Sequence, residues 1–65
     1  MREWLKDYRK KKGLSAAETA KECGISKSYY EKIEAGARNL PVHTAKKIGT
    51  VLQFDWQKFY QEREA

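Results

Sequence analysis

The chain has 65 residues, a formal net charge of +5 and one cysteine, which limits it to a single small domain. Cys23 is the single cysteine, so it cannot form an internal disulfide. One cysteine and one histidine are too few ligands for a structural zinc site, so we expect no metal or cofactor. No apolar run approaches the roughly 20 residues of a membrane span, and charged residues interrupt the start of the chain. These features predict a cytoplasmic protein with no membrane partner and a core of packed helices.

The positive charge lies in two segments that flank a nearly neutral centre. Residues 1–12 carry six Lys/Arg and two acids, and residues 37–52 carry three Lys/Arg and no acid, so their formal charges are +4 and +3. Residues 13–36 and 53–65 each carry −1. An excess of this size on so small a protein indicates a polyanionic partner, and nucleic acid is the commonest.

Two helices are predicted in the first third of the chain. Residues 2–12 place three apolar side chains on one stripe and end at Gly13; the three are Trp4, Leu5 and Tyr8. The sequence Ser15-Ala16-Ala17-Glu18 has the form of a capping box, with the serine as N-cap and the glutamate three residues later. It begins a second helix that ends at Cys23-Gly24.

Three further helices are predicted after this turn. Ser26 is a good N-cap for the third, which Gly36 ends. Pro41 suits the first position of the fourth. The inward side of that fourth helix is predicted to be Val42, Ala45, Ile48, Gly49 and Leu52. Asp55 is an N-cap for a short fifth helix. The chain is therefore predicted to be all-α, with five helices and no strand.

The most informative unit is the pair of short helices at about residues 16–35. A tight turn between two helices sets them at a steep angle and needs a small residue in the first helix and a glycine in the turn. Apolar side chains must also point inward from both helices. The residues that meet these demands in one register are Ala20, Gly24, Ile25, Tyr30 and Ile33.

With these features, residues 4–60 resemble the helix-turn-helix domain of the phage-repressor/Cro family, also called XRE-like. The matching stretches are Leu5…Tyr8-Arg9, Gly13-Leu14-Ser15, Glu18…Ala20, Gly24-Ile25-Ser26, Ile33-Glu34-x-Gly36 and the helix 41–52. The ending Phe54-Asp55-Trp56-x-x-Phe59-Tyr60 is similar to that of small phage and mobile-element regulators. The resemblance implies one five-helix, lambda-repressor-like DNA-binding domain over residues 1–65.

The resemblance also implies roles for individual residues. The third helix would lie in the major groove and contact bases through Ser26, Lys27, Ser28, Tyr29 and Lys32. Phosphates would meet the start of the second helix and the loop after the third, through Ser15, Ala16, Ala17, Arg38 and Asn39. Arg9 and Glu34 match a structural ion pair between the first and third helices.

The sequence departs from the family pattern at four positions. Ala16 replaces a usual glutamine and Ala37 a usual basic residue, and both changes remove DNA contacts. Thr19 replaces a usual leucine, and Gln53 stands where the fourth helix commonly ends in glycine. Glu31 faces the groove by register, where it can accept a hydrogen bond from cytosine, orient Lys27 or remain exposed.

These observations predict a sequence-specific regulator of transcription, a repressor that binds a palindromic operator in double-stranded DNA as a homodimer. The aromatic candidates for the dimer interface are Trp56, Phe59 and Tyr60. The alternative is a protein-interaction module, such as an antitoxin or adaptor, that uses the same helices on a protein partner. No paired carboxylates, activated nucleophile or phosphate-binding loop indicates an enzyme or a small-molecule substrate. Switching would therefore come from a regulatory protein partner, from abundance or from proteolysis.

Overall fold

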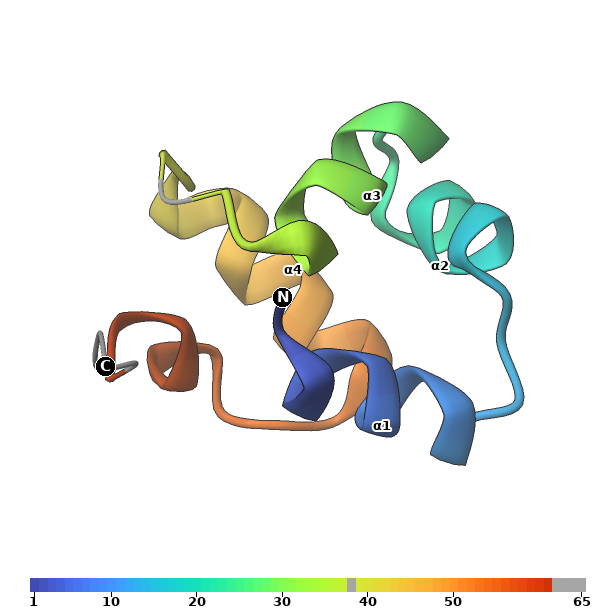
Figure 1. The fold of residues 1–65 in the computed structure, drawn as a ribbon, viewed down its shortest axis with the longest axis horizontal. Coiled ribbons are helices and arrows are strands. Elements are labelled where there is room, and N and C mark those ends of the chain that lie inside the picture. The colour runs from blue at the N-terminus through green and yellow to red at the C-terminus, as the bar shows by residue number, and fades with distance from the viewer. Residues whose placement is uncertain (38, 62–65) are drawn as a thin grey trace.

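The structure, a computed structural model, describes residues 1–37 and 39–61, and these residues form helices and no strand. The four α-helices are α1 (Glu3–Lys11), α2 (Ala16–Cys23), α3 (Lys27–Ala35) and α4 (Val42–Leu52), and a 3₁₀ helix, η1, covers Trp56–Tyr60. In Figure 1, α2 and α3 lie at the upper right, α1 lies below them and α4 passes behind. The all-α prediction is confirmed.

The predicted count of five α-helices is wrong, because the last segment is η1. Asp55 is its N-cap, since Oδ1 accepts a hydrogen bond from the Gln57 N–H at 3.0 Å. The Lys58 N–H bonds to the Asp55 carbonyl, three residues back, at 3.0 Å. Five residues offer too few i→i+4 bonds to offset the cost of nucleating an α-helix, so the tighter 3₁₀ turn forms instead.

Side-chain caps begin α2 and α3 where the sequence predicts them. The Ser15 Oγ accepts from the Glu18 N–H at 3.0 Å, and the Glu18 Oε1 accepts from the Ser15 N–H at 2.8 Å, which completes the capping box. The Ser26 Oγ accepts from the Tyr29 N–H at 3.1 Å. Because a cap satisfies backbone donors that the helix cannot, both starts are fixed locally.

The turn between α2 and α3 depends on Gly24. Its φ of +70° lies in the left-handed region, which a residue with a Cβ adopts only at a cost. The Ile25 N–H then bonds to the Ala20 carbonyl at 3.0 Å and the Gly24 N–H to the Lys21 carbonyl at 3.1 Å. This closes the end of α2 and lets α3 leave at once, which sets the two helices against each other (Figure 1).

Side chains from all four α-helices and η1 meet in one core. The buried apolar residues are Leu5, Ala20, Cys23, Tyr30, Ile33, Leu40, Ala45, Ile48, Leu52 and Phe59. Thr19 is also buried, and its hydroxyl donates to the Ser15 carbonyl at 2.9 Å, so the helix satisfies the polar group that replaces leucine. Val42, predicted to face inward, is 47% exposed. Pro41 precedes α4 as its N-cap instead of opening it, so Val42 is the first residue of the helix.

A close approach at Gly49 joins α4 to the chain after it. A Cβ at this position would lie 2.8 Å from the Phe54 carbonyl oxygen and 3.2 Å from the Trp56 Cβ, so only glycine fits without a shift. The returning segment brings Phe54 and Phe59 against Trp4, with ring centroids 5.3 and 5.1 Å apart. Trp4 therefore packs against the C-terminal segment.

Gln53 ends α4 with a φ of +59°, alone in the left-handed region among the non-glycine residues described. We expect Gln53→Gly to raise the free energy of unfolding by about 1 kcal/mol, because a Cβ in this conformation costs roughly 1–2 kcal/mol and the flexibility of the unfolded chain offsets part of the gain. Urea denaturation measures the change. Gln61→Gly is the matched control, since φ there is −97° and the substitution should bring no gain. Equal effects at both positions would contradict the argument.

Candidate nucleic-acid interface

The two sides of α3 differ sharply in exposure. Tyr30, Ile33 and Glu34 are buried against the rest of the domain. The outward side consists of five exposed residues, Ser26, Lys27, Ser28, Glu31 and Lys32, with Tyr29 partly buried beside them. Four of the five predicted base-contacting residues are therefore exposed, Tyr29 packs partly against the core, and α3 lies at the top of the domain in Figure 1.

An ion pair crosses this surface along the helix. The Lys27 Nζ lies 3.7 Å from the Glu31 Oε2, and the two side chains are 62% and 53% exposed. Such an exposed i,i+4 pair contributes little to stability, so Lys27 can leave it for another acceptor at small cost. Of the roles considered for Glu31, this geometry favours orienting Lys27 in the free protein.

A buried network fixes the inner side of α3 to α1. The Arg9 guanidinium forms two bonds with the Glu34 carboxylate, Nε to Oε2 at 2.9 Å and Nη2 to Oε1 at 3.2 Å. The Tyr30 hydroxyl donates to the same Oε2 at 2.8 Å, and the Arg9 Nη1 donates to the Leu14 carbonyl at 3.0 Å. Arg9 thus connects α3, α1 and the loop before α2.

The network changes the protonation equilibria of its members. Burial alone would raise the pKa of Glu34, but the hydrogen bonds from Arg9 and Tyr30 and the charge of Arg9 outweigh it and lower that pKa. Burial, followed by the bond to Glu34, raises the pKa of Tyr30. Glu34 is therefore held as a carboxylate and Tyr30 as a phenol, which keeps the donors and acceptors matched.

The predicted phosphate site at the start of α2 is partly occupied by the protein itself. The Ser15 N–H already donates to Glu18, whose exposed carboxylate adds negative charge there. Ala16 and Ala17 follow in the first turn, where N–H groups have no acceptor within the helix. Two of the three predicted residues thus keep a backbone donor to offer, and Glu18 opposes an anion at this end.

The loop after α3 is anchored by the C-terminal segment. Asn39 is exposed, whereas Leu40 is buried and its carbonyl accepts from the Tyr60 hydroxyl at 2.7 Å. Arg38, predicted to meet phosphate, lies outside the described residues.

The three aromatic candidates for a dimer interface have different surroundings. Phe59 is 4% exposed and belongs to the core, so it cannot offer a surface to a partner. Trp56 is partly buried, with the Lys46 ammonium 5.2 Å above its ring. Tyr60 is 49% exposed. The structure therefore leaves Trp56 and Tyr60 as candidates.

Arg2 has a role that the sequence reasoning missed, because its charge was counted with the basic first helix. It is 6% exposed. Its Nη1 donates to the Ile33 carbonyl, its backbone N–H donates to the Glu34 carbonyl at 2.8 Å, and its guanidinium lies 5.3 Å from the Phe59 ring centroid. No local pattern indicates this role, because Arg2 precedes α1 and the carbonyl that its side chain bonds lies 31 residues later.

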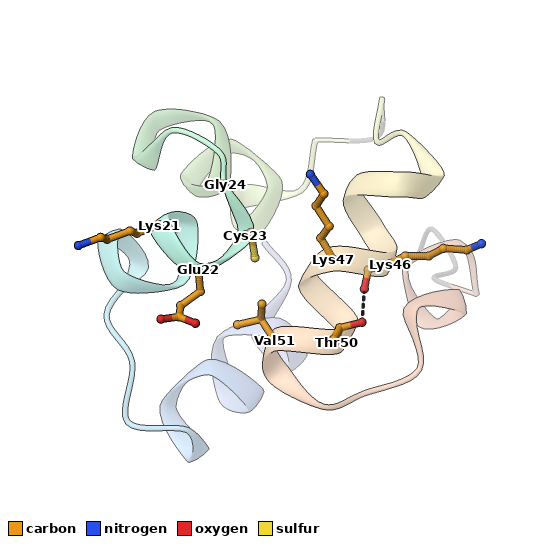
Figure 2. A pocket seen from close by; sticks show the side chains of 8 residues that line it. All are labelled: Lys21, Glu22, Cys23, Gly24, Lys46, Lys47, Thr50 and Val51. Atoms are coloured by element: carbon orange, nitrogen blue, oxygen red, sulfur yellow. Dashed lines mark hydrogen bonds between the residues drawn. The ribbon is translucent and has the colours of Figure 1, made fainter.

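A shallow hollow of about 540 Å³ lies between the end of α2 and α4. Figure 2 shows the lysines at its rim, Lys21, Lys46 and Lys47, pointing in different directions, and the Thr50 hydroxyl is bonded to the Lys46 carbonyl at 2.9 Å. The hollow thus has no convergent polar groups of the kind that bind a small ligand. Within residues 1–37 and 39–61, no three His, Cys, Asp or Glu side chains gather as metal ligands. None of the helices described is long and apolar enough to cross a membrane.

Comparison with known proteins adds a consistent set of relatives. Residues 5–59 match the helix-turn-helix family. The uncharacterized HTH-type transcriptional regulator YqaF of Bacillus subtilis is 45% identical over 62 residues, which cover 95% of this chain and 82% of YqaF. The HTH-type transcriptional regulator SlrR of the same organism is 41% identical over 82% of this chain. The regulator SinR, also from B. subtilis, is 33% identical over 91% of it.

The matches span only 36% of SlrR and 54% of SinR, so this chain corresponds to part of each. The solution structure of the N-terminal DNA-binding domain of SinR, described as a master biofilm regulator, has a TM-score of 0.78 to this chain at 30% identity. That alignment covers all of this chain and 96% of the SinR chain.

Proposed function

Because this chain belongs to the helix-turn-helix family of transcriptional regulators, we propose that it represses transcription by binding a palindromic operator in double-stranded DNA as a homodimer. The observation that carries this proposal is the exposed polar side of α3, which a glycine turn, two caps and a buried ion-pair network hold in one orientation. A rigid helix with such a surface suits the major groove.

In this proposal the outward side of α3 reads the bases. Lys27 and Lys32 would donate to guanine O6 and N7, and Ser28 would contact base edges beside them. Ser26 gives its oxygen to the cap, so its hydroxyl proton is what it can offer to DNA. Tyr29, at the border of the surface, would touch a thymine methyl.

Phosphate contacts would flank this helix on both sides. The N–H groups of Ala16 and Ala17 would bind one phosphate, and Asn39 with Arg38 would bind another. The basic segments at +4 and +3 add long-range attraction. With about 4–8 phosphates neutralised per dimer, the logarithm of affinity should fall with that of salt with a slope of about −4 to −7.

The dimer would form through the α4 and η1 side of the domain, with Trp56 and Tyr60 at its centre. Tyr60 supports this because the residue is 49% exposed while its hydroxyl donates to the Leu40 carbonyl. An ordered, amphipathic ring suits a protein interface. Two such domains would place their α3 helices in successive major grooves, roughly 34 Å apart.

The alternative, a module that binds a protein partner, is favoured by one observation. Glu18 places a carboxylate at the start of α2, where a phosphate would otherwise bind, and Ala16 supplies no side-chain donor there. Both features weaken DNA contacts without harming the fold.

Selection of binding sites from random duplex DNA distinguishes the two functions. We expect an enriched palindrome with half-sites about 10 base pairs apart, because a two-fold dimer presents two copies of α3 on one face of the duplex. The same pool with a Lys27→Ala, Lys32→Ala protein serves as the control and should yield no consensus. Enrichment of no sequence by the wild-type protein would favour the adaptor.

A further inference from the structure

Arg2 lies at the junction of three elements that are distant in sequence. It precedes α1 as its N-cap, it bonds to the last turn of α3, and its guanidinium faces the Phe59 ring of η1. A cation with 6% exposure cannot reach a phosphate from this position. Any effect of Arg2 on DNA binding must therefore act through the residues that it contacts.

The end of α3 provides acceptors that suit an arginine. The last four carbonyls of an α-helix have no partner within the helix, and the helix dipole places partial negative charge on them. The Ile33 carbonyl accepts from the Gly36 N–H at 3.1 Å and also from the Arg2 side chain. The Glu34 carbonyl accepts from the Arg2 backbone N–H at 2.8 Å. One residue thus caps this end with both its charge and its backbone.

Arg2 and Arg9 hold neighbouring parts of the same helix. Arg9 binds the side chain of Glu34, whereas Arg2 binds the backbone of Ile33 and Glu34. Arg9 lies within α1, whereas Arg2 precedes the helix as its N-cap, so the two arginines hold α3 from different places along the chain. With two attachment points, α3 can neither pivot about Glu34 nor slide along α1.

We propose that Arg2 is a positioning residue for DNA recognition, which fixes the C-terminal end of α3 so that Lys27 and Lys32 reach the bases together. This inference rests on the proposed function of α3. Lys27 lies in the first turn of the helix and Lys32 in its second half, so a tilt about either end separates them from their acceptors. Contacts to phosphate adjust more easily than a bidentate contact to a base edge, so Arg2 should affect sequence discrimination more than general affinity.

The test compares Arg2→Met with Lys10→Met. Both substitutions remove one positive charge from the first helical segment, but Lys10 is exposed and Arg2 is not. Fluorescence anisotropy would measure binding to a duplex carrying the selected site and to a scrambled duplex, at a temperature where circular dichroism shows every variant fully folded. We expect Arg2→Met to weaken binding to the selected site about tenfold, the value of one good base contact, and Lys10→Met to weaken both duplexes alike by about twofold.

Equal losses on both duplexes in the two variants would overturn the proposal, because Arg2 would then act only through its charge. If Arg2→Met fails to fold, Arg2→Lys carries the test. Lysine keeps the charge over Phe59 but replaces the guanidinium with an ammonium, so we expect an intermediate loss on the selected duplex, about threefold, and none on the scrambled one. Unchanged discrimination in Arg2→Lys together with an unfolded Arg2→Met would assign Arg2 to stability alone.

A measurement without DNA separates this inference from the proposed function. Backbone amide spectra and hydrogen exchange should change at residues 33–37 in the Arg2 variants and stay unchanged there in Lys10→Met. If wild-type protein shows no sequence discrimination but these amides change as expected, the proposed function fails while the positioning of α3 by Arg2 stands. If discrimination is present and these amides do not change, the positioning role is wrong.

Discussion

Replacing Lys27 and Lys32 together with alanine is expected to lower affinity for the selected operator by about a hundredfold, because each base contact is worth roughly 1–3 kcal/mol. Both lysines lie on the exposed side of α3. Within the part of the chain that the structure describes, the ion pair broken is Lys27 with Glu31, an exposed i,i+4 pair that contributes only about 0.3–0.5 kcal/mol to stability. Binding should therefore fall while the thermal unfolding midpoint hardly moves. Titration of labelled operator, with circular dichroism of the same samples, measures both.

The matched control is Lys10→Ala with Lys12→Ala. It removes the same two charges from exposed positions in and just after α1, away from the outward side of α3. The control should weaken operator and scrambled DNA by the same modest factor, since long-range attraction does not depend on sequence. If the double variant in α3 behaved like this control, the assignment of α3 as the base-reading helix would be wrong.

Glu34→Gln is expected to lower the free energy of unfolding by about 3 kcal/mol. It leaves the Arg9 guanidinium, which bonds Glu34 twice, buried without its counterion. A domain of this size has a total stability of only about 3–10 kcal/mol, so the loss is a large share. Urea denaturation at neutral pH measures it. Glu31→Gln makes the same chemical change on the exposed side of α3 and should stay within about 0.5 kcal/mol of wild type.

The pH dependence of the difference in unfolding free energy between wild type and Glu34→Gln tests whether that difference is electrostatic. Hydrogen bonds from Arg9 and Tyr30 and the charge of Arg9 outweigh burial and hold the pKa of Glu34 below the ordinary glutamate value of 4.5, so folding favours the carboxylate. The stability that Glu34 adds is complete above about pH 4.5 and is lost as the pH falls through the lower, folded-state pKa. The curves for wild type and Glu34→Gln should therefore converge in acid. A difference that is the same at about pH 3 and pH 7 would show that packing, and not charge, carries the effect.

Most of the local structure of this protein could be predicted from short-range patterns in its sequence. Ser15, Ser26 and Asp55 cap helices because their side chains reach backbone donors two or three residues away. Gly24 ends α2 because glycine, which has no Cβ, adopts a positive φ without a steric penalty. These interactions span a few residues, so spacing and residue type suffice to predict them. The exposure of Ser28, Glu31 and Lys32 followed in the same way, because they lie on the side of α3 away from the buried Tyr30 and Ile33.

Contacts between side chains that are distant in sequence depend instead on how the helices pack together. The sequence placed Arg2 with the basic surface, yet it is buried at the end of α3, and it offered Phe59 to a partner, yet the Trp4 ring and the core cover it. The exposure of a side chain and the charges around it depend on which helices pack together. That packing is set by long-range contacts that no local pattern contains.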